Sequence, residues 1–282
     1  MFVRQLLVTL VLGTGVAGAF AQTTRVVRLT TADDVGIIAT YYPSEQDHAP
    51  AVLLLHDLNK DRSGWTDFAA LLQRNGIAAL TIDFRGHGES TRKLTAAGAV
   101  ELKLQDFTSR DLQSMLLDVE AAVDWLQAQS EIEKEHIALI GSGFGGNIAL
   151  RYAALNEDLA GVAALSPGLN EHGIRTDDVV RQLGAMPLHI FVSVDDPFAF
   201  ESSKRLIAIR RESGIKTADK ELTICTGNLH GVAMLKGVKH LPEIMLNWCQ
   251  QVLSGSPRPK RDEAPAATAP ATPPPAPPLR TK

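Results

Sequence analysis

The sequence predicts an α/β protein built on a mostly parallel sheet of about eight strands, with helices on both faces. Two observations carry this prediction. Short apolar segments alternate along the chain with longer amphipathic ones, and the short segments are apolar at consecutive positions, as in strands buried on both faces. Such an alternation is typical of parallel strands that are joined by helices crossing over the sheet.

The predicted strands and helices alternate from residue 25 to residue 253. Two strands at 25–30 and 35–42 are predicted to form a hairpin that opens the domain. Buried strands are predicted to follow at 51–56, 77–82, 136–140, 161–165, 188–194 and 221–225. Helices are predicted at 65–75, 111–129, 145–155, 201–213 and 241–253. In the second helix, apolar residues recur every three or four positions and form a stripe toward the sheet: Leu112, Leu116, Val119, Val123 and Leu126.

The composition is that of an ordinary globular protein, with 45% hydrophobic and 21% charged residues. The formal net charge is −4 and Lys and Arg do not cluster on one face, so nothing indicates a nucleic-acid partner. No CxxC or HExxH spacing accompanies the two cysteines, so they are not expected to bind a metal ion. We also expect no cofactor. For Cys225 and Cys249 two alternatives stay open: a disulfide, or two buried free thiols. The thiols are favoured, because the sequence does not place the Cα atoms within the ~7 Å of a disulfide.

Both ends of the chain differ from its middle. Met1 and Arg4 precede an apolar run at 6–17, and Ala19-Phe20-Ala21 fits a cleavage site. This predicts a signal peptide over 1–21, cleaved after Ala21, and a secreted or periplasmic protein. The run is shorter than the ~20 residues of a membrane span. Residues 254–282 are rich in Pro and Ala, which predicts a disordered tail after a domain at 22–253.

The segment at 140–146, Ile-Gly-Ser-Gly-Phe-Gly-Gly, lies between a predicted strand and a predicted helix. It fits the nucleophile elbow, G-x-S-x-G, in which a sharp turn exposes the attacking side chain. The residue two positions before the nucleophile and the residue two positions after it must both be small. Gly141 and Gly145 meet this requirement only if Gly143 is at the nucleophile position. Ser142 would put large residues at those places and is therefore a poor substitute. The same letters also satisfy the dinucleotide fingerprint G-x-G-x-x-G, but no acidic residue ends the following strand.

Two flanking loops strengthen the first interpretation. The segment at 83–90, Asp-Phe-Arg-Gly-His-Gly-Glu-Ser, closely matches a D-x-R-G-x-G-x-S loop, and the segment at 53–58, Leu-Leu-Leu-His-Asp-Leu, resembles a strand that ends in His-Gly. With these loops the chain resembles the α/β-hydrolase family over about 25–253, in particular its small esterase, lipase and serine-aminopeptidase-like members. The likeness implies the α/β-hydrolase fold with little or no cap. Asp57 departs from the pattern, since the family carries glycine there.

The resemblance also implies roles for later residues. The segment at 193–197 looks like the family's acid loop and the segment at 228–231 like its histidine loop, so position 143, Asp196 and His230 follow the order nucleophile, acid, base. His230 would move the proton, Asp196 would orient its ring, and the N–H groups of Leu58 and Phe144 would form the oxyanion hole. Asp195 is the rival acid.

Glycine at the nucleophile position predicts an impaired enzyme. Loss of the nucleophile lowers turnover about 10⁶-fold, whereas binding and the oxyanion hole still give about 10³ to 10⁴ over water. The leading hypothesis is therefore a pseudoenzyme that binds a small acyl or peptide-like ligand. Ester turnover and a fluorophosphonate probe test it, and Gly143→Ser is the complementary test, since the appearance of an esterase would confirm the pocket. Two alternatives stay open: an ester or amide hydrolase that uses water or Ser142 with the Asp196–His230 dyad, and an envelope interaction module that uses the tail.

Overall fold

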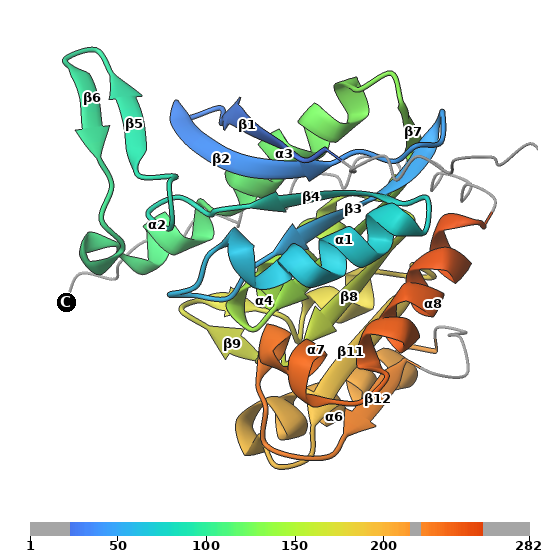
Figure 1. Cartoon of the computed structure of the whole chain (residues 1–282). Coiled ribbons are helices and arrows are strands. Elements are labelled where there is room, and N and C mark those ends of the chain that lie inside the picture. Colours follow the sequence, from blue (N-terminus) through green and yellow to red (C-terminus); the bar gives the residue numbers. More distant parts are fainter. Residues whose placement is uncertain (1–22, 215–220, 256–282) are drawn as a thin grey trace, which may run out of the picture.

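The computed structural model describes residues 23–214 and 221–255. The predicted signal peptide and almost all of the predicted tail lie outside these residues. The described part is organised around a ten-stranded mixed sheet in the order β12-β11-β8-β7-β3-β4-β2-β5-β6, with β1 paired to β2 (Figure 1). The segment from β12 to β4 is parallel, and the pairings that involve β1, β2, β5 and β6 are antiparallel. The parallel part places the carboxyl ends of its strands on one edge.

The strands have the following bounds. The sheet contains β1 (Arg25–Thr30), β2 (Val35–Tyr42), β3 (Ala49–Leu55), β4 (Ala78–Ile82), β5 (Arg92–Thr95), β6 (Gly98–Glu101), β7 (Ile132–Ser142), β8 (Gly161–Leu165), β11 (Leu188–Ser193) and β12 (Leu222–Cys225). A separate small hairpin contains β9 (Asn170–Glu171) and β10 (Ile174–Arg175). Apart from this hairpin and one helical turn, the connection from β8 to β11 carries no further element.

Helices cover both faces of the sheet. The longer ones are α1 (Thr66–Arg74), α3 (Leu116–Ala128), α4 (Phe144–Leu155), α6 (Pro197–Glu212) and α8 (Leu241–Leu253). The shorter ones are α2 (Ser109–Gln113), α5 (Val179–Gln182), α7 (Met234–Gly237) and the 3-10 turns η1 (Arg62–Trp65), η2 (Leu104–Asp106) and η3 (Gly231–Ala233). None of the helices in the described ranges is long and apolar enough to cross a membrane.

The two faces of β3 contribute to two separate apolar layers. Leu53 and Leu55 belong to the layer that contains α3, α4, α5 and α6, whereas Val52 and Leu54 belong to the layer that contains α1 and α8. All four side chains are fully buried. Because successive side chains of a strand point to opposite faces, a run of apolar residues is what a strand covered on both sides requires. Cys225 and Cys249 lie in the second layer as buried free thiols.

The sequence prediction was incomplete at the antiparallel edge. The expected sheet had about eight strands, and it lacks β5 and β6, a hairpin that projects from the body of the molecule (Figure 1). Its residues are almost all exposed, so they carry no apolar pattern from which a buried strand could be predicted. The helix expected at 111–129 is two helices, and the first starts earlier, at Ser109, because Thr108 and Asp111 form a capping box.

Candidate active site

The candidate site lies on the edge where the parallel strands end. The loop after β3 carries Asp57, the turn after β7 carries Gly143, and the loops after β11 and β12 carry Asp196 and His230. In open α/β sheets, ligands bind outside the carboxyl ends of the strands, which is where these four residues meet. The hydroxyl of Ser193 ties two of the loops together, since it donates to the carbonyl oxygen of Leu229 at 2.5 Å.

Gly143 lies at the apex of the turn between β7 and α4. Its backbone has φ 51° and ψ −122°, a conformation that glycine adopts without the penalty that side chains impose. The turn is tight on both sides. A Cβ atom on Gly141 would lie 2.2 Å from the carbonyl oxygen of Gly145, and a Cβ on Gly145 would lie 2.2 Å from that of His56. This is the close approach that a nucleophile elbow centred on residue 143 needs.

The carboxylate of Asp57 fills the space in front of Gly143. A Cβ atom added to Gly143 would come within 2.3 Å of Cγ and Oδ1 of Asp57. Oδ1 accepts hydrogen bonds from the N–H groups of Leu58, at 2.7 Å, and Phe144, at 2.8 Å. These two N–H groups are the ones expected to form an oxyanion hole. A carboxylate oxygen of the protein itself therefore occupies the place in which a substrate's carbonyl oxygen would bind.

His230 lies between two carboxylates. Its Nδ1 is 2.6 Å from Oδ2 of Asp196, and its Nε2 is 3.5 Å from Oδ2 of Asp57. The hydrogen bond with Asp57 is the largest cause that raises the pKa of His230; burial opposes it, Asp196 adds to it, and the pKa reaches about 9. Burial would raise the pKa of Asp57, but the hydrogen bonds from His230, Phe144 and Leu58 together lower it. At neutral pH the site thus holds an imidazolium between two carboxylates.

Ser142 does not provide a nucleophile in this arrangement. Its side chain is buried, and its Oγ accepts a hydrogen bond from the N–H group of Val232 at 2.9 Å. A Cβ on Gly231 would lie 2.2 Å from this Oγ, so the hydroxyl packs against the backbone of the histidine loop. Asp195 is exposed and its N–H group donates to the carbonyl oxygen of Gly227, whereas Asp196 is the acid that contacts His230.

Two further histidines support the loops around the site. The Nδ1–H group of His56 donates to the carbonyl oxygen of Asp57 at 2.7 Å, and its Nε2 accepts from the N–H group of Phe84 at 3.0 Å. The Nδ1–H group of His87 donates to the carbonyl oxygen of Arg85 at 3.0 Å, and its Nε2 accepts from the N–H group of Asn59 at 3.2 Å. Both rings thereby hold the loop that positions Asp57, and burial lowers the pKa of both.

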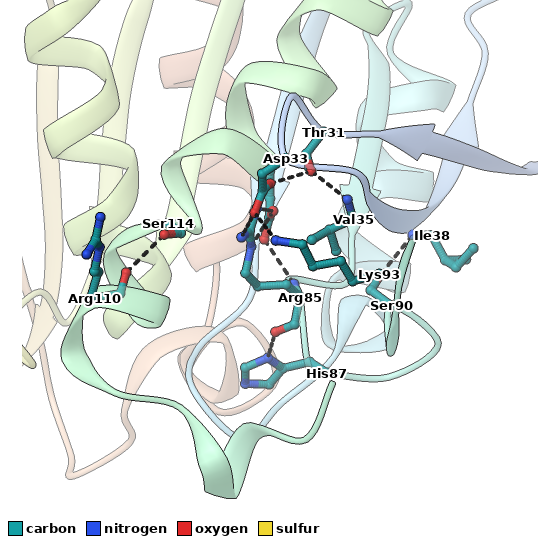
Figure 2. Close-up of polar contacts among 11 residues, drawn as sticks. Thr31, Asp33, Val35, Ile38, Arg85, His87, Ser90, Lys93, Arg110 and Ser114 are labelled. Carbon is teal, nitrogen blue, oxygen red and sulfur yellow. Dashed lines mark hydrogen bonds and ion pairs between the residues drawn. The ribbon is translucent and has the colours of Figure 1, made fainter. Parts of the chain in front are cut away.

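The loop at 83–90 is itself anchored by charge. Figure 2 shows Arg85 reaching Asp33, which also contacts Lys93 and Thr31. On its other side, the guanidinium and the N–H group of Arg85 both donate to the fully buried Asp118 at 2.9 Å. A buried charge needs partners of opposite charge, and two carboxylates supply them here. The arginine at the third position of the D-x-R-G-x-G-x-S segment thus anchors this loop to Asp33 and Asp118.

Comparisons with known proteins identify the family and the fold of the chain. The family model for serine aminopeptidase, S33, matches residues 46–197, which is more than half of the chain. The chain belongs to the serine aminopeptidase S33 family. The polyketide transferase GrgF of Penicillium sp is 28% identical over 148 residues, which cover 52% of this chain and 46% of that protein. The quorum-quenching protein AidA of Acinetobacter baumannii is 27% identical over 128 residues, 45% of this chain and 38% of that protein. The matches span less than half the length of these relatives.

Solved structures show the fold of this S33 family member to be that of α/β-hydrolases. The crystal structure of the α/β-hydrolase GrgF from Penicillium has a TM-score of 0.66 and 17% sequence identity, and the match covers 83% of this chain and 100% of that one. The Pyrococcus furiosus esterase Pf2001 has a TM-score of 0.63 and 17% identity, with coverage of 81% and 92%. At these identities the likeness concerns the fold alone.

Asp57 and Glu171 were not among the site residues predicted from the sequence of this S33 family member. Glu171, on β9, interacts electrostatically with Asp57, His230 and Asp196. Burial and the charge of Asp57 raise its pKa, His230 opposes them, Asp196 adds to them, and the pKa reaches about 7. The sequence did contain a sign that Asp57 belongs to the site, because the family pattern has glycine at that position. It contained no such sign for Glu171, because the hairpin that carries this residue matches no motif.

Proposed function

We propose that this chain is an exported α/β-hydrolase-fold protein that binds a small acyl or peptide-like ligand and is impaired as a serine hydrolase. One observation supports this most strongly: Asp57 occupies both the space of the missing nucleophile and the two N–H groups of the expected oxyanion hole. The proposal combines this geometry with the membership of the chain in a family of hydrolases.

Acyl transfer would fail at two points. Position 143 offers no hydroxyl to attack a carbonyl carbon, and loss of the nucleophile alone lowers turnover about 10⁶-fold. The N–H groups of Leu58 and Phe144 already hold Oδ1 of Asp57, so a substrate's oxyanion would have to displace a negative charge. Loss of one oxyanion donor lowers kcat by about 10²- to 10³-fold in hydrolases of this chemistry.

The protonation of His230 disfavours direct activation of water by the Asp196–His230 dyad. A general base must be unprotonated at the working pH. Because the pKa of His230 is raised to about 9, its imidazole carries a proton at neutral pH and can donate one rather than accept one. The same carboxylate disfavours a dinucleotide ligand, since Asp57 places negative charge at the N-terminus of α4, where a pyrophosphate would have to bind.

The proposal is tested with purified protein, short-chain nitrophenyl esters and a fluorophosphonate probe. We expect no labelling by the probe and ester turnover no faster than that of the His230→Ala variant. Rapid turnover that disappears in His230→Ala would overturn the proposal. The exposed Asp195→Asn substitution is the matched control, since it removes a carboxylate next to Asp196 in the chain and leaves the Asp196–His230 contact in place.

Export and the tail form a separate part of the proposal. The apolar run at 6–17 and the Ala19-Phe20-Ala21 segment favour export. The Pro- and Ala-rich composition after residue 254 favours an extended tail, and we propose contact with the cell envelope as its role. Fractionation of cells that express the chain tests the first point, with recovery in the periplasm or medium as the expected result. Truncation after Leu253 tests the second, and unchanged retention in the envelope would contradict a role for the tail.

A further inference from the structure

We propose that a polar cavity between β2, β4 and the start of α1 binds a saccharide unit that is uncharged or carries an amine. This inference goes beyond the proposed function, because the residues of the candidate active site lie outside the lining of this cavity. The cavity has a volume of about 380 Å³, which falls within the range of about 300 to 1,000 Å³ that small-molecule sites span. Every residue that lines it except Gly88 carries a polar side chain.

The inner wall of the cavity interrupts an apolar pattern. Strand β4 has the sequence Ala-Ala-Leu-Thr-Ile, and its polar residue, Thr81, lies opposite Thr40 of β2. Thr81 is 1% exposed, and its hydroxyl donates to the carbonyl oxygen of Thr40 at 3.5 Å, beyond the usual range of about 2.5 to 3.0 Å for an O–H donor. Because a buried polar group costs free energy unless it is well paired, this hydroxyl favours a ligand whose own O–H groups reach it.

Tyr42 adds an aromatic ring to the same wall. It follows Thr40 by two positions along β2, so both side chains lie on the same face of the sheet. Tyrosine offers a flat apolar surface with a hydroxyl at its edge. A sugar ring likewise combines C–H groups on its faces with hydroxyls around its edge. The inner wall therefore matches both kinds of surface that a sugar ring presents.

The charges around the cavity disfavour an anionic ligand. The guanidinium of Arg62 is held by two carboxylates, since it donates to the fully buried Asp83 and to Oε2 of Glu89 at 2.9 Å. Its Nε donates to the hydroxyl of Thr40 at 3.0 Å. Asp61 adds a third carboxylate at the exposed rim. One cation against three anions leaves excess negative charge, which repels phosphates and acidic sugars and tolerates an uncharged or amine-bearing sugar.

The rim supplies hydrogen-bonding groups that stay accessible. Its exposed residues are Asp61, Ser63, Thr66 and Glu89. Carboxylates accept hydrogen bonds, whereas serine and threonine hydroxyls both donate and accept, as each hydroxyl of a sugar does. Because this rim is open to solvent, the cavity admits a free sugar or the end of a longer glycan, which share the same chemistry.

The test is an NMR titration of the isotopically labelled full chain with glucose, galactose and mannose. We expect at least one of these sugars to give saturable shifts in the backbone amide signals of the cavity residues, Arg62 and Glu89 among them. The 2-amino form of that sugar should bind at least as tightly, whereas its uronic acid should not bind. Cyclohexylamine carries a positive charge without hydroxyls and should leave these signals unchanged. Tighter binding of the matching disaccharide identifies a glycan end as the ligand, and equal binding identifies the free sugar.

Substitutions at the cavity should weaken sugar binding. Thr81→Val and Tyr42→Phe each remove one hydroxyl from the inner wall, and Glu89→Ala removes one carboxylate from the rim. We expect each to weaken binding about 2- to 10-fold, the effect of one lost hydrogen bond. The matched controls are Tyr152→Phe, on α4, and Glu201→Ala, whose side chain is exposed like that of Glu89. Neither control should change the affinity.

Any of four results would overturn the inference: no saturable shift with any of the three sugars, shifts confined to the loops of Gly143 and His230, equal binding of cyclohexylamine or the uronic acid, or unchanged affinity in all three cavity variants. The wild-type titration needs no substitution, so it decides the matter even where a variant does not fold. Circular dichroism verifies the variants. The ester and fluorophosphonate assays concern the candidate active site, so each proposal stands or fails without the other.

Discussion

His230 Nε2 lies 3.5 Å from Oδ2 of Asp57, on the side of the ring opposite to Asp196. In a serine hydrolase this nitrogen faces the hydroxyl from which it takes a proton. Here it faces a negative charge instead, so the favoured resting state is an ion pair rather than a poised base. The charge state of the site therefore depends on a residue of the loop after β3, and several measurements follow from this dependence.

The Asp57→Asn substitution should lower the pKa of His230 toward its ordinary value of 6.5. The hydrogen bond with Asp57 is the largest cause of the raised pKa, and the contact with Asp196, which remains, should keep the pKa above 6.5. Titration of the His230 ring by NMR gives both values. An unchanged pKa in the variant would show that Asp57 and His230 are not paired in solution, and Asp195→Asn is the control that should change nothing.

The ion pair should also make stability depend on pH. The pKa of His230 is raised on folding, so its contribution to the free energy of unfolding is fully present below pH 6.5 and is lost as the pH rises to about 9. The full linkage for such a shift is about 3 kcal/mol, but the ring is 43% exposed and screening reduces it to about 1 kcal/mol. Urea unfolding at pH 6 and pH 10 should show His230→Gln to be less sensitive to pH than the wild type.

A serine at position 143 should not restore an esterase by itself. Its Cβ would come within 2.3 Å of the Asp57 carboxylate, which corrects the expectation that Gly143→Ser alone reports on the pocket. The double variant Asp57→Gly, Gly143→Ser removes this clash and frees the N–H groups of Leu58 and Phe144. We expect fluorophosphonate labelling and ester turnover in the double variant only. Labelling of the Gly143→Ser single variant at its introduced hydroxyl would contradict the steric argument.

Loss of Asp118 should destabilise the fold. Asp118 is fully buried and accepts from the backbone and the guanidinium of Arg85, so Asp118→Ala leaves a buried charge with Asp33 as its remaining partner. Breaking a buried pair of this kind costs about 3 kcal/mol or more. The matched control is Asp177→Ala, which removes a solvent-exposed pair with Arg175 and should change the free energy of unfolding far less than Asp118→Ala does. Denaturant unfolding compares the two.

Periodicity and motifs were sufficient for the parallel core. Consecutive apolar residues such as Val52 to Leu55 predict a strand buried on both faces, and the structure places these residues alternately in two apolar layers. The exposed hairpin β5–β6 carries no such pattern and was missed. The start of α6 was also missed by four residues, because the prediction followed the apolar pattern, whereas the helix begins where Asp196 caps it and Pro197 follows.

The site was harder to predict for a physical reason. Motifs locate loops, and the loops of Gly143, Asp196 and His230 do meet at one edge of the sheet. A motif does not say which side chain fills a space that another has vacated. Glycine at 143 and aspartate at 57 both stand out in the sequence, but only coordinates show that the second side chain occupies the volume in front of the first.

The shared volume in front of Gly143 imposes an order on evolutionary change. A chain with serine at 143 and aspartate at 57 is crowded, whereas a chain with glycine at both positions is not. The uncrowded route between the hydroxyl version and the carboxylate version therefore passes through glycine at both positions, with the serine lost before the aspartate is gained.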